Sequence, residues 1–172
     1  MKEPDRHTDA EQRSFEAMVE THKRVITKVC YMYAENPAHF KDLYQETLIN
    51  LWQARDRFRG DSSEATWIYR ISINTCISCF RRWHRHSETL SMSNPEMMEL
   101  ADRSVNDHEH AMMLKEMYSL INRLPALDKA IILMWLDEKS YEEISEVTGL
   151  KRNAVAARLR RCKLRLQKMS DT

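Results

Sequence analysis

Glycine and proline are scarce in this 172-residue chain, which has only two glycines and four prolines. Such a composition predicts an almost entirely helical protein, because sheets need more turn residues. No run of about eighteen apolar residues occurs, so no segment is expected to span or insert into a membrane. The segment Met1–Arg13 is polar and lacks the apolar core of a secretory signal, which predicts a cytoplasmic protein. Four cysteines without such a signal argue against a disulfide framework.

An excess of charge of one sign is also missing, since the net charge is only +1. The charges are instead separated along the chain. The segment Lys151–Lys168 has eight basic residues and no acidic one, whereas Asp128–Glu146 has six acidic and two basic residues. Clustered bases favour nucleic-acid binding more than a high total charge does.

The segment from Ser140 to Leu166 has the pattern of a helix-turn-helix. Ser140 and Glu143 fit a capping box at the start of a short helix. Gly149 follows where a helix end needs a left-handed residue. A second, basic helix comes next, and in a helix-turn-helix this second helix enters the DNA major groove. The alternative is a solvated cationic helix that closes a small bundle.

Apolar residues at helical spacing predict further helices upstream. The expected helices cover residues 11–33, 39–57 and 64–86, and helical spacing resumes near His110 and again over 126–136. Residues 87–109 have no clear period and carry an acidic excess, which predicts a flexible linker. The chain is therefore expected to be all-α, with two small helical domains, 1–86 and 110–172, joined by this linker.

Three blocks of the chain resemble one family. The first is the segment 42–48 with Trp52, and the second is 58–60 with 66–71 and Asn74. The third is 124–166, which contains the helix-turn-helix pattern. In this order and spacing they resemble bacterial RNA polymerase sigma factors, and the short chain is similar to the extracytoplasmic-function (ECF) subfamily. The resemblance implies a promoter-specificity subunit and not an enzyme. It also implies core RNA polymerase (clamp coiled coil and flap), promoter DNA and an anti-sigma factor as partners.

The resemblance assigns the first block to core-polymerase binding, through Asp42, Gln45, Glu46 and Trp52. A pair of carboxylates with a flanking amide suits a partner helix rich in arginine. The alternatives are a solvated polar face for the first three residues and a core position for Trp52.

The resemblance assigns the second block to the minus-ten promoter element. It implies that Phe58 and Asn74 help to form a pocket for a flipped-out base, which a loop over residues 59–63 covers. Stacking and backbone charge can hold such a base and its strand. The implied contacts are Phe58, Arg59, Asp61, Ser62, Arg70, Asn74, Arg81 and Arg82.

The resemblance assigns the third block to the minus-thirty-five element. The implied contacts are Lys151, Arg152, Asn153, Ala156, Ala157, Arg158 and Arg161. Family members often have a basic residue and a serine where this chain has Ala156 and Ala157. Alanine offers only methyl contact to thymine, so direct base readout is expected to be thin and DNA shape to contribute.

Two other functions fit parts of the sequence. A helix-turn-helix regulator that works without polymerase would explain the third block alone. A redox or metal sensor could use Cys76 and Cys79, although this pair lies within an expected helix and not at its start. No cofactor is expected. No metal site is expected either, because His84, His86, His108 and His110 come in i, i+2 pairs that do not share a helix face.

Overall fold

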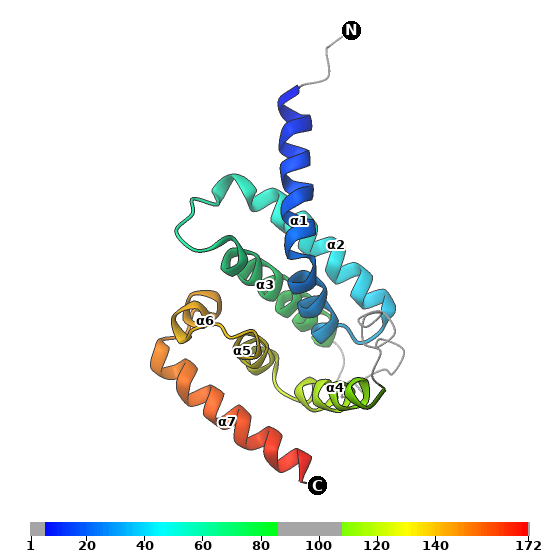
Figure 1. Ribbon diagram of the computed structural model, residues 1–172, viewed down its shortest axis with the longest axis vertical. Helices are drawn as coiled ribbons and strands as arrows, with labels where there is room; N and C mark the ends of the chain where they lie inside the picture. Colours follow the sequence, from blue (N-terminus) through cyan, green and yellow to red (C-terminus); the bar gives the residue numbers. More distant parts are fainter. Residues whose placement is uncertain (1–5, 86–107, 172) are drawn as a thin grey trace.

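The computed structural model describes residues 6–85 and 108–171 (Figure 1), and all the secondary structure in these ranges is helical. The elements are α1 (Arg6–Tyr33), α2 (Pro37–Ala54), the 3₁₀ helix η1 (Arg55–Arg57), α3 (Glu64–His84), α4 (His108–Asn122), α5 (Ala126–Leu136), α6 (Tyr141–Thr148) and α7 (Arg152–Ser170). The all-α prediction is therefore confirmed. None of the described helices is long and apolar enough to cross a membrane.

The helices α1, α2 and α3 pack against one another and form the first domain. Its core includes Ile26, Val29, Leu43, Leu51 and Ile68, all fully buried. Side chains at the helix starts fix the turns between these helices. The side chain of Asn36 caps α2, whose first residue is proline, and Ser63 caps α3. The first turns of α1 extend beyond the other two helices (Figure 1).

Two helix boundaries of this domain differ from the sequence-based expectation by three residues or more. The first helix begins at Arg6 and not at Glu11. The second ends at Ala54, and its last expected turn is the 3₁₀ helix η1, in which Arg57 is exposed. Polar residues at helix ends carry little periodic signal, so sequence patterns locate such ends poorly.

The helices α4 to α7 form the second domain, and α6 with α7 makes the predicted helix-turn-helix. Both bonds of the capping box are present, between the Ser140 side chain and the Glu143 N–H and between the Glu143 side chain and the Ser140 N–H. Gly149 ends α6 with φ of 73°, in the left-handed region. Ile144, Val147 and Val155 are buried between the helices. The expected linker, 87–109, lies outside the described residues except for the first two residues of α4.

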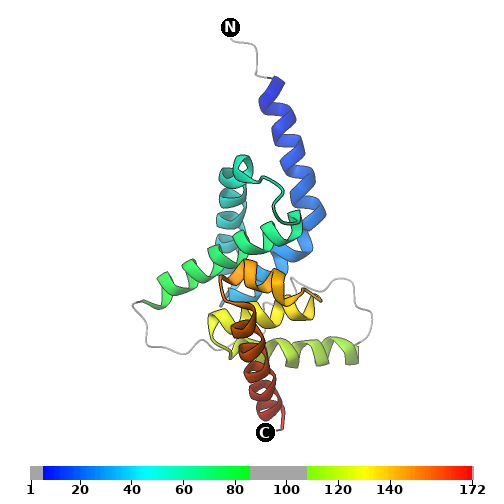
Figure 2. The ribbon, with the colours of Figure 1, turned by 90° about the vertical axis from the view of Figure 1, so that its left-hand side faces the viewer.

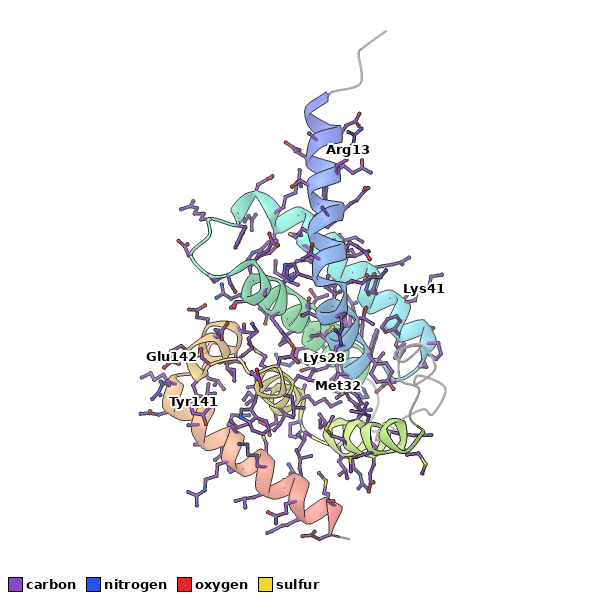
Figure 3. The ribbon with its side chains drawn as sticks, viewed as in Figure 1. Arg13, Lys28, Met32, Lys41, Tyr141 and Glu142 are labelled. Atoms are coloured by element: carbon purple, nitrogen blue, oxygen red, sulfur yellow. The ribbon has the colours of Figure 1, made fainter. Side chains whose placement is uncertain are left out.

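The two domains are in contact, which the sequence does not predict. The helix α3 packs against α5 and α6, and α1 packs against α4 and α5 (Figures 1 and 2). Lys28 points from α1 toward the second domain, where it pairs with Asp137 at the end of α5 (Figure 3). The Tyr33 hydroxyl donates to the backbone carbonyl of Ala126 across 2.5 Å. These contacts position three candidate interfaces relative to one another.

Candidate protein and nucleic-acid interfaces

The exposed face of α2 carries the residues predicted to bind polymerase. Asp42 and Gln45 are exposed and Glu46 is partly exposed, while Leu43, Thr47 and Leu51 point into the core. Ile49, which was not among the predicted residues, is 50% exposed on this face. Ile49 is four residues after Gln45 and seven after Asp42, so it lies in the same stripe. An exposed isoleucine beside carboxylates is a feature of a protein-docking surface, and its i+4 spacing from Gln45 indicates it.

Trp52 lies beside this stripe and turns toward α1. Its ring meets the ring of Phe15 edge-on, with centroids 5.0 Å apart, and the Arg55 guanidinium lies 3.7 Å from the indole centroid on its face. These contacts leave Trp52 partly exposed. The Trp52 side chain therefore has a packing role in the free chain, whichever surface it also serves.

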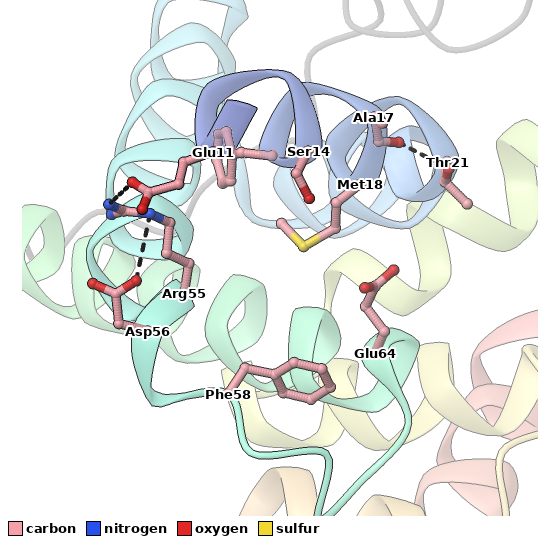
Figure 4. Close-up of a pocket in the computed structure, with 10 residues that line it drawn as sticks. Glu11, Ser14, Ala17, Met18, Thr21, Arg55, Asp56, Phe58 and Glu64 are labelled. Atoms are coloured by element: carbon pink, nitrogen blue, oxygen red, sulfur yellow. Dashed lines mark hydrogen bonds and ion pairs between the residues drawn. The ribbon is translucent and has the colours of Figure 1, made fainter. Parts of the chain in front are cut away.

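The loop after η1 brings Phe58 to the edge of a hollow of about 460 Å³ (Figure 4). The Phe58 ring packs on Trp67 at 5.0 Å, and Met18 and Glu64 lie across the hollow from it. Gly60 has φ of 76°, in the left-handed region that glycine adopts most readily. Of the other loop residues predicted to contact DNA, Arg59 and Asp61 are exposed and Ser62 is partly exposed.

A second hollow, of about 340 Å³, lies between α2 and α3. Four polar residues of α3 that line it recur at intervals of four, so they form one stripe along the helix. The sequence analysis named three of them but missed Ser78, which the same spacing indicates. The four residues are Arg70, Asn74, Ser78 and Arg82.

The α3 stripe has the chemistry of a single-strand track. It combines guanidinium groups for phosphates with an amide and a hydroxyl for base edges. Arg81 is exposed beside it. Asn74 lines this hollow, whereas Phe58 lines the other one. The structure thus does not bring these two residues together in a single pocket.

The outer face of α7 is basic and open to solvent. Val155, Leu159 and Cys162 are buried against the other helices, which turns the opposite side of α7 outward. Of the residues predicted there, Ala156 is partly exposed, and the exposed ones are Lys151, Arg152, Asn153, Ala157 and Arg161. Arg160 is also exposed, follows Ala156 by four residues, and was missed. Its long donor side chain can reach base edges that the two alanines cannot.

Two of the arginines of α7 that are predicted to contact DNA already have partners. Arg158 donates to Asp128 of α5 across 2.7 Å, which braces α7 against α5. Arg152 donates to Glu142 of α6 across 2.5 Å. The pKa of Glu142 lies below its usual value because its own backbone N–H and the Arg152 guanidinium favour the ionised carboxylate. Arg152 would have to exchange this carboxylate for a phosphate on binding DNA.

Of the CxxC pair, Cys76 lies in the core of the first domain, and Cys79 is buried at the edge of the hollow between α2 and α3. Cys76 and Cys79 are buried in α3, and the Cys76 Sγ lies 4.0 Å from the Cys30 Sγ. Burial raises the pKa of the Cys76 thiol well above its ordinary value, which makes it unreactive. Among the described side chains, no group of three or more histidine, cysteine or acidic residues could hold a metal ion. His86 and the side chains of His108 and His110 lie outside this description.

Two family models match the chain. That for Sigma-70 region 2 matches residues 18–86, and that for Sigma-70, region 4 matches residues 114–166. The chain is 29% identical over 162 residues to the ECF RNA polymerase sigma-E factor of Escherichia coli (strain K12), with 89% of this chain and 84% of the relative covered. It is 32% identical over 87 residues to the ECF RNA polymerase sigma factor SigG of Mycobacterium tuberculosis, which covers 51% of this chain and 24% of that protein.

Solved structures with this fold include the sigma factor RpoE from Bartonella quintana, in complex with the anti-sigma factor NepR. The TM-score is 0.73 at 20% identity, with 93% of this chain and 98% of that chain covered. CnrH in complex with the cytosolic domain of CnrY has a TM-score of 0.66 at 21% identity, with 93% and 89% covered. At these identities the likeness establishes the fold alone.

Proposed function

Because the chain belongs to the ECF subfamily of RNA polymerase sigma factors, we propose that it binds core RNA polymerase and directs it to specific promoters. In this role it is a transcription-initiation subunit and not an enzyme. It acts in the cytoplasm, where polymerase and chromosome are found, and needs no cofactor.

The observation that carries this proposal is the presence of three different surfaces on one chain. The α2 stripe is acidic with an exposed isoleucine, which suits a protein partner. The α3 stripe and the Phe58 loop combine aromatic, basic and amide groups, which suits single-stranded DNA. The outer face of α7 is basic and suits duplex DNA. A regulator that only binds duplex DNA would need the third surface alone.

Each of the three surfaces has a different binding role. The α2 stripe docks on the clamp coiled coil, with Ile49 as an apolar anchor one turn after Glu46. The α3 stripe and the loop, through Phe58 and Asn74, hold the melted minus-ten strand. The second domain contacts the polymerase flap and reads the minus-thirty-five element through α7. The linker over 87–109 joins the two domains across the polymerase.

An anti-sigma factor is the further partner that we propose. Two solved proteins with this fold were crystallised with another protein bound, NepR in one case and the cytosolic domain of CnrY in the other. Such a partner would cover the α2 stripe or the DNA-binding surfaces and so keep the chain from initiating transcription.

The first prediction concerns the α2 stripe. The double variant Asp42→Ala/Glu46→Ala, and separately Ile49→Ala, should each weaken the binding of core polymerase about tenfold or more, since central interface residues carry most of the binding energy. Fluorescence titration of labelled full-length chain with Escherichia coli core enzyme measures this. Binding of duplex DNA should stay unchanged.

A matched control is available on α1. Glu16→Ala/Glu20→Ala removes two exposed carboxylates at the same i, i+4 spacing, but on a helix outside the proposed dock. Equal core affinity for this control and the α2 variants would contradict the assignment of the stripe. Run-off transcripts that do not change when the chain is added would refute the proposed function itself.

A further inference from the structure

Two cysteines from different helices face each other in the core of the first domain. Cys30 of α1 and Cys76 of α3 are both fully buried, and their Sγ atoms lie 4.0 Å apart. They are 46 positions apart in the sequence, and the packing of α1 on α3 brings them together (Figure 1). The CxxC spacing gives no indication of this pairing between helices.

Hydrogen bonds make the two thiols chemically unequal. The Cys76 thiol donates to the Cys30 Sγ, and the buried Thr47 hydroxyl of α2 lies 3.7 Å from the same sulfur. The hydrogen bond from Cys76 lowers the pKa of the Cys30 thiol below its ordinary value, despite the opposing effect of burial. Cys30 therefore has more thiolate character than Cys76, and the thiolate is the form that oxidants attack.

The hollow between α2 and α3 gives a small oxidant an approach to this pair. Thr75 and Cys79 line the hollow, one position before Cys76 and three positions after it on α3. Cys79 is 5% exposed at its edge and accepts a hydrogen bond from Arg82 across 3.3 Å. Hydrogen peroxide is little larger than water, so a slight local opening of this wall admits it.

We propose that Cys30 and Cys76 are a modification site, at which hydrogen peroxide converts the two thiols into a disulfide that ties α1 to α3. The Cys30 thiolate first attacks the peroxide, the O–O bond breaks, and a sulfenic acid forms. The departing hydroxide takes up the proton that Cys30 lost on ionisation. The Cys76 sulfur then attacks the Cys30 sulfur, and the hydroxyl group leaves as water with the Cys76 proton. The two sulfurs lose two electrons in all, and one peroxide becomes two water molecules.

Closing the disulfide requires a small movement with a large effect on the unfolded chain. The sulfurs lie 4.0 Å apart and must approach by about 2 Å, since an S–S bond is about 2 Å long. The bond closes a loop over residues 30–76, which contains all of α2 and the loop with Phe58. Such a cross-link lowers the entropy of the unfolded chain and so stabilises the fold. The first domain would thus resist unfolding while peroxide is present and relax when the thiols are reduced again.

Peptide mapping of the full-length chain tests the pairing. The folded chain is treated with hydrogen peroxide, its remaining thiols are alkylated with N-ethylmaleimide in urea, and it is digested with trypsin. Trypsin leaves Cys30 in residues 29–41 and both cysteines of the CxxC in residues 71–81. Mass spectrometry should find these two peptides joined, both in the wild type and in Cys79→Ala, and separated after treatment with dithiothreitol.

Matched variants show which cysteines form the bond. Cys76→Ala should yield no joined product, whereas Cys162→Ala, which removes a buried thiol of the second domain, should yield as much as the wild type. Absence of the joined peptides from the oxidised wild type would overturn the proposal, whether Cys30 is found alkylated or oxidised further. A disulfide between Cys76 and Cys79 in place of the expected one would also overturn it.

Urea unfolding tests the effect of the bond. The double variant Cys79→Ala/Cys162→Ala retains only the pair, and its tryptophan fluorescence mainly reports the first domain, which contains three of the four tryptophans. After peroxide treatment its unfolding midpoint should fall by about 1 M urea or more when dithiothreitol is added. Dithiothreitol leaves oxidised methionines unchanged, so this comparison isolates the disulfide. A midpoint that dithiothreitol does not change would refute the stabilising role of the pair. None of these measurements involves polymerase or DNA, so they test the pair independently of the proposed function.

Discussion

Single side chains in this protein are often held by partners that the sequence does not reveal. Arg158 is one of the basic residues of α7, yet its guanidinium is fixed by Asp128, thirty residues earlier. Trp52 follows the acidic stripe of α2, yet it packs on Phe15 and Arg55. The pairing of a charge depends on chain segments far apart in sequence, so residue type and spacing alone cannot supply it.

Lys129 gives a prediction at this scale. Burial lowers the pKa of its ammonium group to about 8, despite the opposing effect of Glu35. The folded chain therefore binds this proton less tightly than the unfolded chain does. At a pH where Lys129 is protonated in both states, this difference lowers the free energy of unfolding by about 3 kcal/mol. Lys129→Met removes this cost and should raise the free energy of unfolding at pH 7 by about 1–3 kcal/mol.

The pH dependence supplies the check. In the wild-type chain the cost is complete below pH 8 and disappears as the pH rises toward 10.5, where the unfolded lysine also loses its proton. Urea unfolding of both proteins should therefore show a gap in stability that narrows over this range. Cysteines and tyrosines also titrate in this pH range. They are present in both proteins, so their contributions to the difference in stability cancel. If the difference in the free energy of unfolding between the two proteins stayed constant with pH, burial of the Lys129 charge would not be the cause of that difference.

Whole elements follow the sequence more closely than single contacts do. The capping box at Ser140 and the left-handed Gly149 set both ends of α6, and both are local features. The same is true of Ser63 at the start of α3. At the start of α1, by contrast, the expected boundary was wrong by five residues.

The cap of α6 gives a prediction at this scale. Ser140→Ala removes the acceptor for the Glu143 N–H and should lower the free energy of unfolding by about 1 kcal/mol. Thermal unfolding followed by circular dichroism measures this. Ser140→Asp, which retains an acceptor at the cap, should lose much less. If both variants were equally destabilised, the serine would act by some means other than capping.

At the scale of the whole molecule, the separation of acidic from basic residues matters more for DNA binding than the net charge does. A chain of net charge +1 can bind DNA only if its bases are gathered on one surface, as they are on α7. Such binding depends on salt, because each phosphate contact releases counterions. The same separation leaves α6 acidic, and in the folded chain its carboxylates face the first domain.

Arg161 provides the prediction here. In anisotropy titrations with a random-sequence duplex, Arg161→Ala should weaken binding at low salt and reduce the slope of log affinity against log salt by about one. Lys41→Ala removes an exposed charge from α2 and should leave the slope unchanged. Equal slopes for the two variants would show that Arg161 does not contact phosphate.

The sequence by itself determined the helices, the helix-turn-helix and the family, because periodicity, caps and turn residues act over a few positions. The resemblance to one family supplied the residues that are predicted for the three surfaces. Only the tertiary structure decided which charges are paired and that α6 and Asp137 contact the first domain. The contacts between the domains join residues more than sixty positions apart, and no local pattern encodes such distances.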